Sequence, residues 1–412
     1  AGCRRDCILA GAHTAPIAFS PKTVHLPFVM SVCLGNREVR CVLFAGYAPV
    51  HFVCFLPVYR QLMQDQRIEV WLTGGFRRKS GQTIAYELKG LYDSFDVDSS
   101  QIISVEQARR KDFDVMVCAC LSGDFIDLFR DSVGKTVEIF HGVSFKNLLV
   151  REKALRYDVL CLPGHYHASL YRKHGLIRAD SSLCAITGFP KVDSLVSGTM
   201  DRERILRTLN VDPGKTTLLY APTGGRQNSL EIMGEEVIKR VGTELAWNLL
   251  IKPHDHPKNR IDWFSRLAPF ENERVRLVRD NDVVPYMYAA DLLISDASSV
   301  SVEYTLLDRP IVFLNVPSLL AKSKRQSKAL DLETYGTKIG RCVESPEEVV
   351  GAIRESLDYP KRKSDIRKAA AQEIFYEPGH ATGRVTGMIL YAAGVEEAPP
   401  PGVICLEPDV EA

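Results

Sequence analysis

Two serines at the start of a predicted helix are the residues of this sequence whose type and spacing best fit anion binding. Ser298 and Ser299 follow the apolar run 292–295, which reads as a short buried strand, with Asp296 in between. Backbone N–H groups at a helix start lack intrahelical partners, and the helix dipole favours negative charge there. The turn therefore predicts a seat for a phosphate or pyrophosphate. The simpler alternative is that Asp296 or Ser298 only caps the helix.

Three further polar motifs also follow apolar, strand-like runs. They are His141-Gly142, Thr223-Gly224-Gly225 and Pro253-His254. Ligands of open parallel α/β sheets bind beyond the carboxyl ends of the strands, so we expect all four motifs around one site. A histidine takes a proton from a hydroxyl near neutral pH, or binds a phosphate. His141 and His254 are therefore the candidate catalytic residues, although a lone histidine at a strand end is more often structural.

Charged residues close to these motifs extend the predicted site. Lys146 and Lys252 lie near the two histidines in sequence and would add positive charge, unless both are simply solvated. Glu303 stands about one helical turn beyond the serines, where a carboxylate either accepts hydrogen bonds from ribose hydroxyls or faces solvent. The sequence contains no G-x-x-x-x-G-K-[ST], H-E-x-x-H or nucleophile elbow. Their absence argues against nucleotide hydrolases, metalloproteases and serine hydrolases.

Strand-like and helix-like runs alternate from residue 39 onward and fall into two series. Apolar strands separated by helices predict parallel sheets covered by helices on both faces. We therefore expect an α/β fold with two Rossmann-like, doubly wound domains, 39–198 and 199–390, facing a central cleft. We expect an irregular segment at 1–38 and a disordered tail at 391–412. The predicted strands are 39–44, 68–72, 114–120, 136–140, 159–161, 183–187, 217–221, 248–252, 275–277, 292–295 and 311–314.

Composition limits the class of protein. A length of 412 residues favours two domains, and a formal net charge of +1 argues against a general nucleic-acid binder. Eleven cysteines at irregular spacing, without paired C-x-x-C units, fit buried thiols in a reducing compartment. No apolar run is long enough for a membrane-spanning helix, and no secretory signal is recognisable, so we expect a cytoplasmic protein. Basic clusters at 77–79, 322–328 and 361–368 are solvated faces, or contacts for a polyanion or an anionic membrane.

The ordered motifs resemble those of the CDP-glycerol glycerophosphotransferase family of teichoic acid and capsule polymerases. The family patterns keep their order from residue 140 to 314. Four positions depart from them, namely Val143, Lys191, Gly225 and Ala297, so the identity of the donor alcohol is left open. The matching stretches are 140–146 for W-H-G-T-P-L-K, 166–172 for a tyrosine-rich segment, 188–193 for G-[LYF]-P-R-x-D, 220–226 for Y-A-P-T-F-R, 252–254 for K-P-H, 290–303 for A-D-x-L-I-[ST]-D-Y-S-S-x-x-x-[DE] and 309–313 for K-P-I-x-F.

The resemblance implies a GT-B fold and transfer of glycerol phosphate, or a similar polyol phosphate, from a CDP-activated donor to an acceptor hydroxyl. The product would be a teichoic-acid-like or capsular polymer. His141 would be the general base, with Gly142 and Lys146 on the acceptor side in domain 39–198. The donor pyrophosphate would be bound by domain 199–390 through Thr223, Arg226, Lys252, His254, Asp296, Ser298, Ser299 and Glu303.

The resemblance also implies which partners to expect. No cofactor and no metal are required. The donor is a nucleotide-activated small molecule, and the acceptor is a polyol phosphate or a glycan- or lipid-linked molecule. We expect no nucleic acid, and peripheral contact with the inner face of the cell membrane is left open.

Two other functions are kept as alternatives. A GT-B glycosyltransferase or a relative of the UDP-sugar 2-epimerases would share the fold and the anion-binding turn. An epimerase needs additional carboxylates in the cleft, for which Asp124, Asp193 and Asp255 are candidates. The third alternative is a sugar-nucleotide-binding or scaffold protein without catalytic activity.

Overall fold

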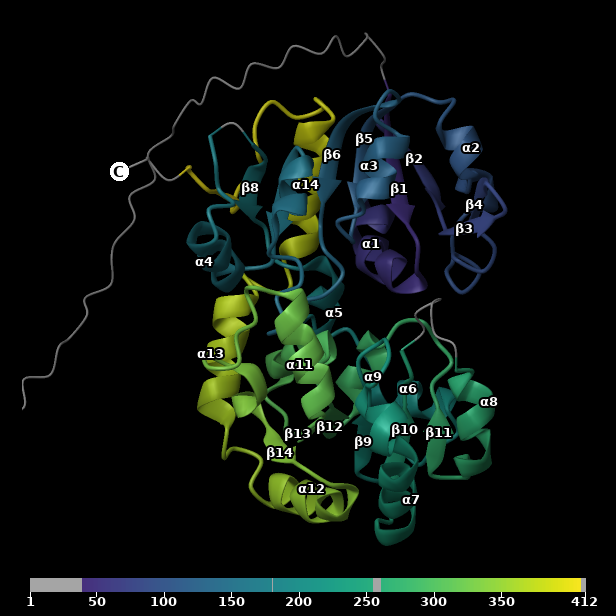
Figure 1. Cartoon of the computed structure of the whole chain (residues 1–412), viewed down its shortest axis with the longest axis vertical. Helices are drawn as coiled ribbons and strands as arrows, with labels where there is room; N and C mark the ends of the chain where they lie inside the picture. The colour runs from purple at the N-terminus through teal and green to yellow at the C-terminus, as the bar shows by residue number, and fades with distance from the viewer. Residues whose placement is uncertain (1–38, 180, 255–260, 409–412) are drawn as a thin grey trace, which may run out of the picture. The chain divides into compact units, whose positions relative to one another are not determined.

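Two parallel β-sheets, each covered by helices, and a two-stranded hairpin form the described part of the chain (Figure 1). The computed structural model describes residues 39–179, 181–254 and 261–408, all of which belong to one compact unit. The predicted irregular segment 1–38 lies outside these residues. The α/β architecture with two doubly wound sheets is as predicted from the alternation of apolar strands with helices.

The first sheet has the strand order β15-β8-β7-β6-β5-β1-β2 and is parallel except for β15. Its central strands are buried along their length, which is why they read as continuous apolar runs. The strands are β1 (Arg40–Gly46), β2 (Ile68–Gly74), β5 (Phe113–Cys118), β6 (Val133–Glu138), β7 (Val159–Leu162), β8 (Leu183–Ile186) and β15 (Ile404–Cys405). The helices between them are α1 (Pro49–Leu62), α2 (Val105–Ala108), α3 (Gly123–Leu128), α4 (His165–Lys173) and α5 (Asp193–Val196).

The second sheet has the order β11-β10-β9-β12-β13-β14 and is parallel throughout. Its last strand was not predicted, because three residues beginning with an exposed arginine carry no apolar run. The strands are β9 (Thr217–Tyr220), β10 (Asn248–Ile251), β11 (Val275–Leu277), β12 (Leu292–Ser295), β13 (Ile311–Leu314) and β14 (Arg341–Val343). The helices are α6 (Arg202–Thr208), α7 (Glu235–Glu244), α8 (Trp263–Leu267), α9 (Val284–Ala289), α10 (Ser299–Glu303), α11 (Pro317–Gln326), α12 (Val349–Asp358), α13 (Ser364–Ile374) and α14 (Ala381–Ala392).

The C-terminal part of the chain returns to the first sheet, which corrects two predictions. Helix α14, assigned to the second domain by its position in sequence, packs against α1 and strands β5 to β7 of the first sheet. The predicted disordered tail 391–412 is wrong for residues up to 408. There β15 pairs antiparallel with β8, and the Pro400 ring packs against Gly387 of α14. Backbone pairing and this packing order a proline-rich segment whose composition alone suggests disorder.

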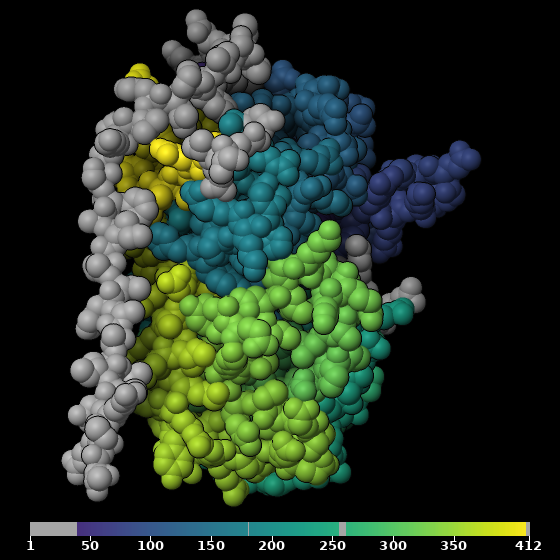
Figure 2. All heavy atoms as spheres, turned by 60° about the vertical axis from the view of Figure 1, so that its left-hand side comes forward, coloured from purple at the N-terminus to yellow at the C-terminus, as the bar shows by residue number. Residues whose placement is uncertain are grey.

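The basic clusters are partly neutralised by nearby carboxylates. Residues 77–79 lie on the unpredicted hairpin of β3 (Phe76–Ser80) and β4 (Thr83–Glu87), which is largely exposed and projects from the surface (Figure 2). Arg78 pairs with Glu87 at 2.8 Å. In the cluster 361–368, Lys361 and Arg367 both pair with Asp308. Two of the three basic clusters, 77–79 and 361–368, therefore carry less net charge than their sequences suggest.

Two findings concern the membrane and the thiols. No helix in the ranges given above is long and apolar enough to cross a bilayer. The eight cysteines in those ranges are unbridged, and most are buried, in keeping with the predicted buried thiols.

Candidate functional site

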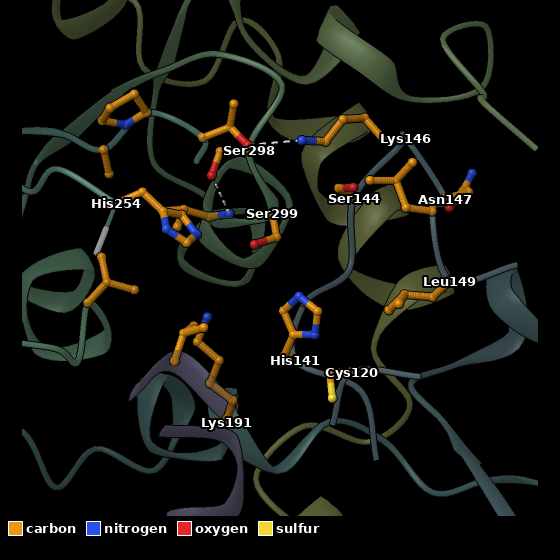
Figure 3. Close-up of a pocket in the computed structure, with 18 of the residues that line it drawn as sticks. Cys120, His141, Ser144, Lys146, Asn147, Leu149, Lys191, His254, Ser298 and Ser299 are labelled. Atoms are coloured by element: carbon orange, nitrogen blue, oxygen red, sulfur yellow. Dashed lines mark hydrogen bonds between the residues drawn. The ribbon is translucent and has the colours of Figure 1, made fainter. Parts of the chain in front are cut away.

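A cavity of about 310 Å³ is lined by residues that follow strands of both sheets (Figure 3). His141 and Gly142 come after β6, whereas Thr223 follows β9. The segment 252–254 follows β10, and Ser298 with Ser299 follows β12. The four motifs predicted to meet at the carboxyl ends of parallel strands therefore line one cavity.

Gly142 connects the two halves of the site. A Cβ atom built on this glycine would lie 3.0 Å from Ser299 Oγ and 3.1 Å from Ser299 Cβ, closer than side chains normally approach. The residue beside His141 therefore contacts the predicted anion-binding turn. A side chain at position 142 would require Ser299 to shift by a few tenths of an ångström, which favours a glycine here.

The His141 ring is oriented by the first sheet. Its Nδ1 hydrogen-bonds to the Ala119 carbonyl oxygen, and since a carbonyl only accepts, Nδ1 carries the proton. In the neutral ring, Nε2 is then the nitrogen that takes up a proton. The His51 ring of α1 lies 4.9 Å away, centroid to centroid, and the Cys54 thiol donates to the His141 carbonyl oxygen at 3.5 Å.

Glu138 supports the two loops that carry this hydrogen bond. Its carboxylate is fully buried and accepts the backbone N–H of Leu121 at 3.0 Å and of Phe140 at 3.1 Å. Both residues have positive φ, at 47° and 59°, a conformation that needs support in non-glycine residues. Burial raises the pKa of Glu138 to about 7.

On the second sheet, Asp296 organises the Thr223 turn instead of binding phosphate. It is 2% exposed, and its two oxygens accept the N–H of Thr223 at 2.8 Å and of Ser229 at 2.9 Å. It does not line the cavity, and burial raises its pKa. The prediction of Asp296 as a pyrophosphate ligand is therefore wrong, because both oxygens are committed to backbone amides.

Glu303 and Arg226 also lie outside the cavity lining. Glu303 is fully buried and pairs with Lys191 Nζ at 2.7 Å and 3.0 Å, so the predicted contact with ribose hydroxyls is wrong. Burial disfavours the charge on Lys191, but the Glu303 carboxylate outweighs it and raises the pKa of the lysine. Arg226 is exposed, and the glycine before it, Gly225, has a positive φ of 92°.

The turn that carries Ser298 and Ser299 both caps a helix and lines the cavity. Ser298 precedes α10 and accepts the Val300 N–H at 3.4 Å, so it caps the helix while also lining the cavity. Helix α10 has only five residues, and a 3₁₀ turn, Tyr304–Leu307, extends it. On the neighbouring turn, the His254 ring packs against Gly224, where a Cβ would lie 2.9 Å from the ring.

The cavity is electropositive. Its lining includes Lys146, Arg151, Lys191 and Lys252 and, within the described ranges, neither Asp nor Glu. Lys146 Nζ donates to Thr223 Oγ1 at 2.9 Å, which links the two sheets across the cavity, and burial lowers its pKa. The charge of Lys191 is balanced by Glu303, so Lys146, Arg151 and Lys252 supply the positive charge that suits an anionic ligand of the size of a diphosphate.

Five residues of the site were not predicted, namely His51, Glu138, Arg151, His167 and Lys191. Lys191 and His167 lie in stretches matched to the family, 188–193 and 166–172, but neither was proposed as a site residue. His51, Glu138 and Arg151 belong to no motif, and no spacing in the sequence connects them to His141. Clusters of three or more His, Cys, Asp or Glu placed to bind a metal were not found among residues 39–179, 181–254 and 261–408.

Comparison with known proteins agrees with this arrangement. Residues 135–391 match the family described as CDP-Glycerol:Poly(glycerophosphate) glycerophosphotransferase. The teichoic acid glycerol-phosphate primase of Bacillus subtilis is 28% identical over 212 residues, covering 50% of this chain and 51% of the primase. The teichoic acid glycerol-phosphate transferase of Staphylococcus aureus is 26% identical over 261 residues, covering 57% and 61% of the two chains.

Solved structures show the same architecture. The wall teichoic acid polymerase TagF superimposes with a TM-score of 0.62 at 17% identity, over 88% of this chain and 92% of that one. The UDP complex of S. aureus MnaA superimposes with a TM-score of 0.59 at 14% identity, over 88% and 99%. These structural similarities concern the fold alone, which is GT-B, as predicted.

The chain spans about half of the B. subtilis primase, namely 51% of its length. The family match nevertheless covers more than half of this chain and contains every cavity residue from His141 to Val300. The chain therefore belongs to the CDP-glycerol:poly(glycerophosphate) glycerophosphotransferase family.

Proposed function

We propose that this protein transfers glycerol phosphate, or a similar polyol phosphate, from a CDP-activated donor to an acceptor hydroxyl in the synthesis of a teichoic-acid-like polymer. Family membership supports this reaction type. The observation that carries the proposal is the contact between Gly142 and Ser299, which brings the predicted base and the predicted phosphate seat into one electropositive cavity.

In the proposed reaction, His141 Nε2 accepts the proton of the acceptor hydroxyl as its oxygen attacks the phosphorus that carries the polyol. A new O–P bond forms, the bond to the bridging oxygen of the diphosphate breaks, and CMP leaves. The hydrogen bond from Nδ1 to the Ala119 carbonyl stabilises the imidazolium that results.

The second sheet binds the donor in this proposal. Ser298, Ser299, Lys252 and His254 contact the diphosphate, and Thr223 is oriented toward it by Lys146. Positive charge fixed in the cavity before the reaction stabilises the negative charge that develops on the leaving phosphate. No resident cofactor is needed, and this remains a prediction.

A relative of the UDP-sugar 2-epimerases would share the fold but is less well supported. Asp193 accepts N–H groups from residues 379–382, and Asp124 lies 3.8 Å from Arg77 on the exposed side of the first sheet. Neither lines the cavity, and Asp255 lies outside the described residues. A carboxylate-dependent epimerisation therefore lacks its acid–base groups among the cavity residues that are described.

The acceptor and its location are also part of the proposal. A polymer primed on a lipid-linked acceptor would bring the protein to the inner face of a cell membrane, by peripheral contact rather than insertion. Sedimentation with vesicles that contain anionic lipid, compared with neutral vesicles, tests this contact.

The central experiment measures CMP release from CDP-glycerol and CDP-ribitol, with UDP-N-acetylglucosamine as the alternative donor. We expect CMP release that depends on acceptor and falls by about 100-fold or more in His141→Ala. Donor affinity, measured by calorimetry, should be nearly unchanged in that variant. Histidine-dependent turnover of the UDP-sugar would instead favour the glycosyltransferase or epimerase alternative. Tight nucleotide binding without turnover of any donor would favour the scaffold alternative.

A further inference from the structure

The segment 144–151 forms one wall of the cavity; Lys146 joins it to the Thr223 turn, and Arg151 lies at the other end of the segment. Figure 3 shows His141 between His254 on one side and Asn147 and Leu149 on the other. A nucleophile that displaces a leaving group in line must approach phosphorus from the side opposite to that group. If the second sheet holds the nucleotide, the acceptor approaches along segment 144–151.

Helix α4 supports this segment through its aromatic hydroxyls. Asn147 Nδ2 donates to Tyr166 Oη at 3.0 Å, and Tyr171 Oη donates to the Leu149 carbonyl oxygen at 3.0 Å. His167 is four residues before Tyr171 and therefore lies on the same helix face, where it lines the cavity. The wall beyond His141 is thus a supported structure rather than a loose loop.

Arg151 is the cation at this end of the cavity. It lines the cavity and is exposed at its rim. Burial raises the pKa of the Tyr47 and Tyr171 hydroxyls, and the positive charge of Arg151 partly opposes this rise for both. Among the described residues, its side chain has no hydrogen bond or ion pair. By contrast, Lys146 is bound to Thr223 and Lys191 to Glu303.

His167 provides a neutral polar group in the lining of the same cavity as this cation. It is 6% exposed, and its Nδ1 is buried and has no hydrogen-bond partner in the part of the chain that is described. Burial lowers the pKa of His167 to about 4, so the ring is uncharged near neutral pH. A neutral imidazole in a cavity wall suits a hydroxyl of a ligand rather than an anionic group.

We infer that Arg151 and His167 form an acceptor subsite that binds the terminal unit of a phosphate-containing polyol chain. Arg151 contacts the phosphodiester next to the terminal unit, and His167 contacts a hydroxyl of that unit, so that the attacking hydroxyl is presented to His141. The identity of this ligand rests on the proposed function. The subsite itself rests on the unpaired guanidinium and the unpartnered imidazole in one cavity wall.

The test compares Arg151→Gln and Arg151→Lys with the matched control Arg130→Gln, which removes a surface arginine that does not line the cavity. Calorimetry measures binding of a short glycerol phosphate oligomer, without donor, to each protein. We expect Arg151→Gln to weaken binding by about 10-fold or more, because a charge-assisted hydrogen bond to phosphate is lost. Arg151→Lys should retain most of the affinity, and Arg130→Gln all of it.

A second measurement separates this inference from the proposed function. With CDP-glycerol as donor, Arg151→Gln should raise KM for the oligomer and leave KM for the neutral acceptor glycerol unchanged, whereas His167→Phe should raise KM for both, because glycerol presents the same hydroxyl. Oligomer binding equal to wild type in Arg151→Gln, or no binding to wild-type protein, would overturn the inference. Arg151-dependent binding without CMP release from any CDP donor would support the subsite and contradict the proposed reaction.

Discussion

The two sides of the cavity are built in different ways. On the second sheet, each turn follows its own strand directly, and one buried carboxylate, Asp296, accepts two backbone N–H groups of the Thr223 segment. On the first sheet, His141 depends on residues from β1–α1, β5 and β6, which are far apart in sequence. Donor binding should therefore be most sensitive to the loss of Asp296, whereas the alignment of the base should be sensitive to changes in several separate elements.

The pair Lys191–Glu303 joins the two sides, and removing one partner should have the largest effect on stability. Lys191→Ala leaves a carboxylate that is fully buried without its counter-charge. Breaking a buried ion pair typically destabilises a protein by about 3–5 kcal/mol. Denaturant unfolding of Lys191→Ala should show a loss of this size. The double variant Lys191→Met, Glu303→Leu should recover much of it, and equal losses in both variants would argue against the pair.

Glu138, which supports the loops around His141, should make the free energy of unfolding depend on pH. Its folded pKa of about 7 lies above the usual carboxyl value, so the folded state binds the proton more tightly. Stability from this group is complete below about pH 4.5 and falls by up to about 1.4 kcal/mol per pH unit as pH rises to about 7. Unfolding at several pH values should show this slope in the wild type and a shallower one in Glu138→Gln. An identical slope in the variant would assign the pH dependence to other groups.

The variant Asp296→Ala tests whether donor affinity depends on the turn that carries Thr223. Asp296→Ala leaves the buried N–H groups of Thr223 and Ser229 without an acceptor, which should destabilise the protein by about 1–3 kcal/mol. Donor affinity should fall as well, because the Thr223 turn loses its support. Destabilisation with unchanged donor affinity in calorimetry would remove this turn from the donor site.

The smallest predicted effect concerns the serine hydroxyls. Ser298→Ala with Ser299→Ala should weaken donor binding by about 1 kcal/mol for each hydroxyl and leave the fold intact. Acceptor affinity should not change, since both hydroxyls lie on the donor side. Calorimetry with CDP-glycerol measures the loss, and donor affinity equal to wild type would exclude the serines from the site.

The sequence determined the elements and the strand-end motifs because both are local. Apolar runs flanked by polar turns predicted β9 to β13 within one residue of their observed ends, together with the motifs that line the cavity. The same reasoning missed the hairpin β3–β4, strand β14 and the return of the chain to the first sheet. Those elements have exposed, short or proline-rich sequences that acquire structure only through pairing and packing.

What only the tertiary structure decided was which charged and polar groups face the cavity. Asp296 and Glu303 occur in the same motif as Ser298, yet backbone amides and Lys191 hold both carboxylates away from it. Arg151 and His51 belong to no motif, and His167 was not singled out within its own, yet all three lie at or beside the cavity. A sequence records the order of residues along one strand or turn, whereas the orientation of a buried charge depends on partners contributed by distant segments.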